Sequence, residues 1–207
     1  MLSWLIKNKT KEYEDRLLKS FPTELKSDVE SVIRILPLEK NDVKLCEGQV
    51  HKVEHLVHPT ELTIKVNGEQ LTIPCRLYFD EPDIDSENNL TERQKVILNC
   101  IYLRHHNGYL RERRLKKLVD MTEKWIIPFT IQLLGEYVFE ILEVLNIQIN
   151  EKTIGNYYSF VEENSKYWQQ TESRMISYWN EYYRGKFPKL KEYLGTALVK
   201  RIKKTEV

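Results

Sequence analysis

The stretch "LRHHNGYLRERRLKKL", residues 103–118, combines two adjacent histidines with an Asn-Gly pair and several basic residues. A histidine can act as a general base near neutral pH or ligate a metal ion. Adjacent histidines at a turn point in different directions, so one ligand from His105 and His106 is more plausible than two. The structural alternative is that Arg104 and the histidines end a helix, where positive charge favours the terminal carbonyls, and that Asn107-Gly108 reverses the chain.

A short basic helix is predicted over residues 109–120. From Arg104 to Lys117 the chain carries six basic residues and one acidic residue, which could contact phosphates or could form a solvated face. The basic residues on the helix are Arg111, Arg113, Arg114, Lys116 and Lys117. Arg114 lies four residues from both Leu110 and Leu118, so we expect it on the apolar side, where a guanidinium needs a partner or a route to solvent.

Three glutamates, Glu136, Glu140 and Glu143, are spaced to form one stripe on a predicted helix over 124–147. They could be a narrow exposed face. They could also hold Arg111 or Arg114, because a guanidinium and a carboxylate can form a bidentate pair. A third interpretation is acid–base or metal chemistry together with the histidine pair. We expect Glu136 or Glu140 to lie within hydrogen-bond reach of one of the two arginines.

A second histidine group, His51, His55 and His58, has a spacing that could gather one metal ion on a helix. The same segment could equally be extended, and no cysteine or carboxylate motif completes a site. The chain also lacks an H-E-x-x-H motif, a glycine-rich phosphate loop and a nucleophile elbow. We therefore assign no catalytic residue, no metal ligand and no cofactor.

Aromatic residues recur from Tyr157 to Tyr183 at near-heptad spacing. Core packing is the usual reason for such a stripe, but these rings cover more than one face of a predicted helix over 152–184. We therefore expect an exposed apolar patch that binds a protein partner or a second copy of the chain, with Trp168 and Trp179 as binding residues. Stacking on nucleic-acid bases is the alternative.

The remaining pattern predicts the elements that position these residues. Helices are expected over 3–20, from a possible N-cap at Thr23 to Leu36, from the capping box Thr91–Gln94 onward, and over 189–204. Strands are expected over 61–66 and 71–79, joined by an Asn67-Gly68 turn, and residues 80–89 read as a linker. Gly185 fits a helix C′ position.

The composition favours an α+β, mostly α protein: a segment of helices and a β-hairpin over 1–88 and a helical bundle over 89–207. The chain has 207 residues, a net charge of +1 and three cysteines without a C-x-x-C pair. These features favour a cytoplasmic protein without a disulfide framework. The longest uncharged stretch near the apolar centre has 11 residues, whereas a membrane span needs about 18 or more. We therefore expect no membrane insertion.

The segments "GYLRERRLKKLV" and "IIPFTIQLLGEYVFEILEVL" together resemble a helix pair of the HEAT type. The resemblance covers about 40 residues, and no second copy follows at the period that such repeats need. It implies an arginine-bearing helix packed on an apolar one, and no function is carried over from it. The sequence as a whole favours a non-catalytic protein-interaction or scaffold module that binds its partner through the aromatic surface and the corner over 103–118. The further binding residues that we expect there and on the glutamate stripe are Arg104, His105, His106, Asn107, Arg111, Arg114, Glu136 and Glu140. The alternatives are a nucleic-acid-binding accessory protein and a metal or acid–base enzyme centred on His105, His106 and Glu136.

Overall fold

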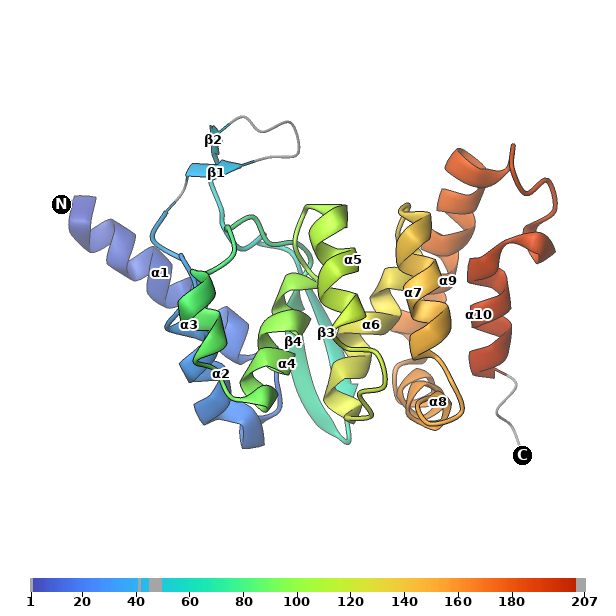
Figure 1. Cartoon of the computed structure of the whole chain (residues 1–207), viewed down its shortest axis with the longest axis horizontal. Helices are drawn as coiled ribbons and strands as arrows, with labels where there is room; N and C mark the ends of the chain where they lie inside the picture. Colours follow the sequence, from blue (N-terminus) through green and yellow to red (C-terminus); the bar gives the residue numbers. More distant parts are fainter. Residues whose placement is uncertain (1, 41, 45–49, 204–207) are drawn as a thin grey trace. The chain divides into compact units, whose positions relative to one another are not determined.

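The computed structural model describes residues 2–40, 42–44 and 50–203 (Figure 1). The protein is 59% helical and contains two small two-stranded antiparallel sheets, which confirms the α+β, mostly α fold class. The chain divides into two compact units. Unit 1 comprises Met1–Ile64 and Gly68–Arg111, and unit 2 comprises Lys65–Asn67 and Glu112–Val207. The division into separately folding domains at residues 88 and 89 stays a prediction.

Unit 1 contains three longer helices, shorter helical turns and both sheets (Figure 1). Helix α2 packs against both α1 and α4, and α1 also packs against β4. The elements are α1 (Leu2–Leu18), η1 (Thr23–Leu25), α2 (Lys26–Ile33), β1 (Asp42–Lys44), β2 (Val50–Lys52), β3 (Glu61–Val66), β4 (Glu69–Pro74), α3 (Ile84–Asn88), α4 (Glu92–Tyr102) and the start of α5 (Gly108–Lys116).

The β3–β4 hairpin turns at the predicted residues. Asn67 and Gly68 have φ angles of 52° and 83°, as a two-residue hairpin turn of the primed type requires. The second strand was predicted to reach residue 79, but β4 ends at Pro74, and the chain bends at Cys75. Beyond it, Cys75 N donates to Thr60 O at 2.9 Å, which continues the same register for one more pair.

The helix starts in unit 1 were predicted with mixed success. The capping box is confirmed, because Gln94 N donates to Thr91 Oγ1 and Thr91 N donates to Gln94 Oε1. Thr23 is not an N-cap: it begins the 3₁₀ turn η1, and its N–H donates to the Glu69 carboxylate at 2.9 Å. The predicted linker over 80–89 was wrong, because Asp83 accepts from two backbone amides and caps the short helix α3.

Lys65–Asn67, the end of β3 and the first residue of its turn, belong to unit 2, and the rest of the unit consists of helices and the segments that join them. Its helices α8, α9 and α10 pack on one another, α10 also packs on α7, and α9 packs on η3. The elements are η2 (Lys124–Ile126), α6 (Ile127–Ile131), η3 (Gln132–Gly135), α7 (Phe139–Gln148), α8 (Ile154–Glu163), α9 (Ser165–Tyr178), the π-helical turn η4 (Trp179–Tyr183), η5 (Leu190–Glu192) and α10 (Leu194–Lys203).

The single helix predicted over 124–147 was wrong. The chain leaves the helical conformation at Glu136, whose backbone is extended with φ −113° and ψ 157°. A Cβ at Gly135 would lie 3.0 Å from the Arg174 Cβ, so a glycine lets this turn approach α9 closely. Most of the predicted apolar core is nevertheless buried, since Ile131 and Leu134 are 0% exposed, but Tyr137 is 46% exposed and Val138 is partly buried.

The helix predicted over 152–184 also divides, at Asn164. The Asn164 side chain donates to Lys65 O at 2.8 Å and accepts from Lys65 N at 2.7 Å, as a neighbouring strand would do. This pairing takes Asn164 out of helical geometry, with φ −128° and ψ 46°. Gly185 is not a left-handed C′ residue, because Gly68 is the one glycine with positive φ in the described part of the chain. The final helix begins only at Leu194.

Candidate functional site

The histidine pair lies in a corner that follows α4, beside the segment that continues β4. Leu77 N donates to Arg104 O, and His106 N donates to Leu77 O, both at 2.9 Å. The buried Arg104 side chain donates to Pro74 O at 3.0 Å and to Cys75 O. Strand-like backbone bonds and one guanidinium therefore hold residues 104–106 against residues 74–77.

Both ring nitrogens of His105 are hydrogen-bonded within this corner. Its side chain is 4% exposed, and its Nδ1 accepts from Asn107 N at 3.1 Å. The proton must therefore be on Nε2, which lies 3.1 Å from Phe79 O and donates to it. Burial, reinforced by the neighbouring His106, lowers the pKa of His105 to about 3. A neutral ring with both nitrogens bonded to backbone groups positions the chain and is not poised to ligate or to transfer a proton.

His106 differs from His105 in having a nitrogen without a partner. Its ring stacks on Tyr78 with centroids 5.5 Å apart and an interplanar angle of 17°. Its Nε2 is buried and has no hydrogen-bond partner in the described residues. Burial and the nearby Arg111 and Arg76 cations lower the pKa of His106, so the ring is neutral near pH 7.

Asn107 and Arg111 connect the corner to α5. The Asn107 side-chain oxygen accepts from Tyr109 N at 3.0 Å and from Leu110 N at 3.4 Å, so Asn107 is the N-cap of α5. Neither Asn107 nor Gly108 has a positive φ, so this pair begins α5 without a left-handed turn residue. The fully buried Arg111 donates to His105 O at 2.6 Å and to His106 O at 2.9 Å. Ligand binding by these residues stays a prediction.

The basic helix presents fewer charges to solvent than its sequence suggests. Arg111 and Arg114 are 0% and 2% exposed, and Lys116 pairs with Glu112 at 2.6 Å. The burial of Arg114 is as expected from its position between Leu110 and Leu118. This arrangement weakens the case for a continuous phosphate-binding face on α5.

Among the three glutamates of the predicted stripe, only Glu136 is buried. It is 5% exposed, whereas Glu140 and Glu143 are exposed. Glu136 and the buried Arg114 belong to the same unit. The hydrogen bond between an arginine of α5 and Glu136 or Glu140 stays a prediction.

The second histidine group lies in extended and irregular chain. His51 is part of β2, and His55 Nε2 lies 3.5 Å from an exposed Glu54 carboxylate. Over the described ranges, no three His, Cys, Asp or Glu side chains converge in a way that could hold a metal ion. Cys75 and Cys100 are free thiols, and Cys46 lies outside the described residues. Within those same ranges, no helix is both long and apolar enough to cross a bilayer.

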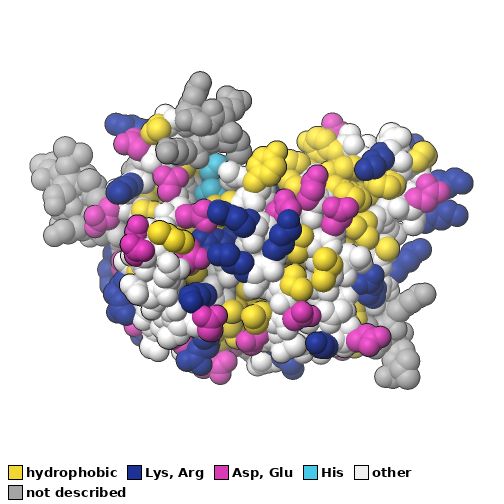
Figure 2. Space-filling model, viewed as in Figure 1, with side chains coloured by type: hydrophobic (Ala, Val, Ile, Leu, Met, Phe, Trp, Pro, Cys, Tyr) yellow, Lys and Arg dark blue, Asp and Glu magenta, His cyan; other side chains and the backbone are white. Residues whose placement is uncertain are grey.

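A cluster of aromatic side chains in unit 2 is the most distinctive feature of the surface. We call it the aromatic cluster; its members come from the chain before α7, from α7, from α9 and η4, and from the segment before α10. The members are Tyr137, Phe139, Tyr178, Trp179, Tyr182, Tyr183, Phe187 and Tyr193. Figure 2 shows hydrophobic side chains gathered on the face over α7 and α9.

The inner rings of the cluster are fixed by packing and hydrogen bonds. Tyr193 is 1% exposed and stacks on Tyr183 with centroids 5.5 Å apart, and burial raises the pKa of both phenols. Phe139 and Phe187 stack at 5.6 Å. Tyr183 OH donates to Tyr137 O at 2.5 Å. This support holds the outer rings without a bound partner.

The outer rings form an exposed group of three. Tyr182 is 60% exposed and Tyr137 is 46% exposed, and both pack against the partly buried Tyr178 with centroids 5.9–6.0 Å apart. Ile176 is 43% exposed on the preceding turn of α9. The expected apolar patch is therefore present.

Two tryptophans were predicted to bind a partner. Trp168 is 3% exposed and belongs to the core. Trp179 is partly buried and donates its Nε1–H to Phe187 O at 2.9 Å, at the base of the cluster. The sequence therefore predicted an exposed aromatic patch within the stripe that contains Tyr182, but it did not name Tyr182 as a binding residue and did not include Tyr137 in the patch.

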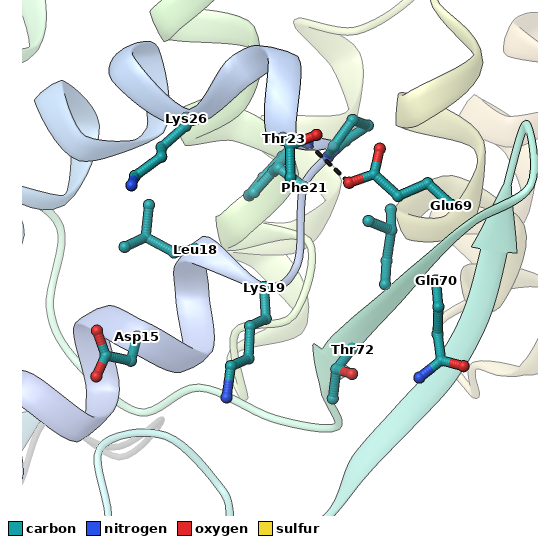
Figure 3. A pocket seen from close by; sticks show the side chains of 11 residues that line it. Asp15, Leu18, Lys19, Phe21, Thr23, Lys26, Glu69, Gln70 and Thr72 are labelled. Carbon is teal, nitrogen blue, oxygen red and sulfur yellow. Dashed lines mark hydrogen bonds between the residues drawn. The ribbon is translucent and has the colours of Figure 1, made fainter.

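A cleft in unit 1 had no signal in the sequence. It has a volume of about 640 Å³ and opens between the end of α1, the turn η1 and β4 (Figure 3). Lys19 and Lys26 line it together with Asp15 and Glu69, over an apolar floor that includes Leu71. The two signs of charge balance, and the lysines are exposed, so the cleft shows no preference for one class of ligand.

No protein-family model, no curated protein and no solved structure matches this chain. The fold class and the aromatic cluster are therefore the observations from which a function is argued.

Proposed function

We propose that the protein is a non-catalytic interaction module that binds a protein partner through the aromatic cluster. Tyrosine, tryptophan and arginine are the residues that dominate binding energy at protein interfaces. Tyrosine rings contribute a large contact area with few rotatable bonds, and their hydroxyls satisfy polar groups of the partner. A surface with these properties costs little conformational entropy on binding.

The observation that carries the proposal is the support beneath the outer rings. Tyr137 is 46% exposed and Tyr182 is 60% exposed, yet each packs on Tyr178 and on the other. An exposed aromatic side chain that serves only the core gains nothing from such exposure. Rings held in place and open to solvent are typical of interaction sites on folded proteins.

The two alternatives have less support in the structure. A nucleic-acid-binding surface on α5 would depend on Arg113, Lys116 and Lys117, because Arg111 and Arg114 are buried. An enzyme centred on the histidine pair would rest on His106, because the nitrogens of His105 are occupied. The cysteine pattern of the sequence favours the reducing cytosol as the compartment in which the partner is met.

Site-specific photocross-linking tests the proposal. A photoreactive phenylalanine analogue replaces Tyr182 in one protein and Tyr109 in another, and both are expressed in the cells from which the chain derives. Tyr109 is the matched control because it is an exposed tyrosine, 83% accessible, on α5 in unit 1. We expect one discrete adduct, with a protein or with a second copy of the chain, from position 182 only. Equal adducts from both positions, or none from position 182, would contradict the proposal.

A further inference from the structure

Two cationic side chains lie over aromatic rings at one edge of the aromatic cluster. The Arg184 guanidinium carbon lies 5.9 Å from the ring centre of Trp179. The Lys186 ammonium lies 5.1 Å from the centre of Phe139 and 5.4 Å from that of Phe187. These side chains are held against the rings by cation–π attraction while their charged ends remain exposed. Arg184 and Lys186 therefore hold two positive charges in place beside the rings, and we call this edge of the cluster the cationic margin.

The segment around this margin is basic as a whole. Residues 174–191 contain five basic side chains and one acidic side chain, in a protein whose total net charge is only +1. All six are exposed. They are Arg174, Arg184, Lys186, Lys189, Lys191 and Glu181. Two exposed glutamates, Glu140 and Glu143, lie on α7 after Phe139, and Glu140 is close enough to add to the effect of burial in raising the pKa of Tyr183. The exposed charge that the segment 174–191 adds to the cluster is therefore mainly positive.

The geometry of the rings favours a peptide over nucleic-acid bases. Tyr137 is tilted by 53° from Tyr178 and by 43° from Tyr182, so the outer rings do not present a set of parallel faces. Base stacking needs open, flat faces beside a continuous cationic track. Tilted rings beside the aliphatic Ile176 instead form an uneven apolar surface against which the side chains of a peptide can pack.

We propose that the aromatic cluster binds an acidic segment of a partner protein in which apolar side chains alternate with carboxylates. The apolar side chains would pack against the exposed surfaces of Tyr137, Tyr182 and Ile176. The carboxylates would pair with Arg184 and Lys186 at the cationic margin. This inference rests on the proposed function and adds the chemistry of the partner.

Selection from a random dodecapeptide library tests the chemistry without knowledge of the partner. The full chain, the Tyr182→Ser variant and the Tyr109→Ser variant are each used as bait. We expect wild type and Tyr109→Ser to enrich peptides with Asp or Glu beside Leu, Phe or Tyr, and Tyr182→Ser to lose them. Peptides that depend on Tyr182 but show no acidic enrichment would overturn this inference and leave the proposed function intact. A pool that does not change with Tyr182 would count against both.

Affinity measurements on the most enriched peptide then test the cationic margin. Arg184→Gln and Lys186→Gln should each weaken binding by about 2- to 5-fold, the range expected for an exposed ion pair. The control Lys52→Gln, on the exposed strand β2 of unit 1, should leave it unchanged. Circular dichroism confirms that each variant is folded. If all three variants bind alike, or if an oligothymidine binds through Tyr182 more tightly than any peptide, the inference is wrong.

Discussion

Mild acid should destabilise the protein through one buried histidine. His105 is 4% exposed, and both its ring nitrogens are engaged by backbone groups in the neutral form. Burial lowers the pKa of His105 in the folded chain to about 3, against about 6.5 in the unfolded chain. Between these values only the unfolded state takes up the proton. Stability is therefore fully present above pH 6.5 and is lost as the pH falls.

The expected loss is about 2 kcal/mol between pH 7 and pH 5. The figure depends little on the folded pKa, because any value below about 4 leaves His105 neutral at pH 5. It is set by the free energy of protonating an ordinary histidine in the unfolded chain. His106 shifts in the same direction for the same main reason and adds to the slope.

Urea unfolding of wild type, His105→Gln and His51→Gln at pH 7, 6 and 5 measures this loss. The pH dependence of His105→Gln should be smaller than that of wild type by about 2 kcal/mol over this range. His51 is exposed on β2, so His51→Gln should follow wild type. An equal pH dependence for His105→Gln and wild type would refute the reasoning. An NMR titration of the His105 ring in the folded protein with a midpoint near 6.5 would refute it as well.

Three further predictions concern packing and caps. Arg114→Met and Glu136→Gln should each lower the free energy of unfolding by about 3 kcal/mol, because each changes a buried charged residue. If the two side chains form a pair, the double variant should lose less free energy of unfolding than the sum of the two single losses. Additive losses in urea unfolding would exclude the pair. Asn107→Ala should cost about 1 kcal/mol by removing the N-cap of α5, whereas Asn107→Asp keeps the cap, so equal losses would contradict this role. Gly195→Ala should lower the free energy of unfolding by about 1–3 kcal/mol, because its Cβ would lie 2.8 Å from a methionine carbon. Gly155 has open space around it, so Gly155→Ala should stabilise α8 by up to about 1 kcal/mol. If Gly195→Ala unfolds at a higher temperature than Gly155→Ala, the close approach at Gly195 does not restrict the side chain.

Local chemistry was a reliable guide to parts of the fold. The Asn67-Gly68 turn and the Thr91–Gln94 capping box each depend on residues no more than three positions apart. The apolar side of α2 is buried as its spacing predicts, with Val29 and Val32 at 0% exposure. In each case the deciding interaction is present in the short segment itself, so the sequence contains the information.

The breaks in the two long predicted helices depend on distant parts of the chain. Gly135 meets Arg174 on α9, and Asn164 pairs with Lys65, which is 99 positions away. Apolar periodicity continues through both breaks, because the residues on each side remain in the core. Periodicity reports burial, and here tertiary contacts overrode the helical pattern.

The exposure of individual rings in the aromatic cluster also could not be predicted from local sequence. The abundance of rings between Tyr157 and Tyr183 predicts that some are exposed, because one helix cannot bury all of its faces. Which rings are exposed depends on the π-helical turn η4 and on the extended backbone at Glu136, just before Tyr137, neither of which has a local signature. Trp168 therefore looked equivalent to Trp179 in the sequence but lies in the core.

The affinity of the partner captured at position 182 tests the central claim most directly. The purified partner is titrated into wild type, Tyr182→Ser and Tyr109→Ser, with folding checked for each. Loss of a central tyrosine at an interface should weaken binding about 10-fold or more, and loss of Tyr109 by less than about 2-fold. If the partner binds all three proteins with the same affinity, the aromatic cluster is not the binding surface.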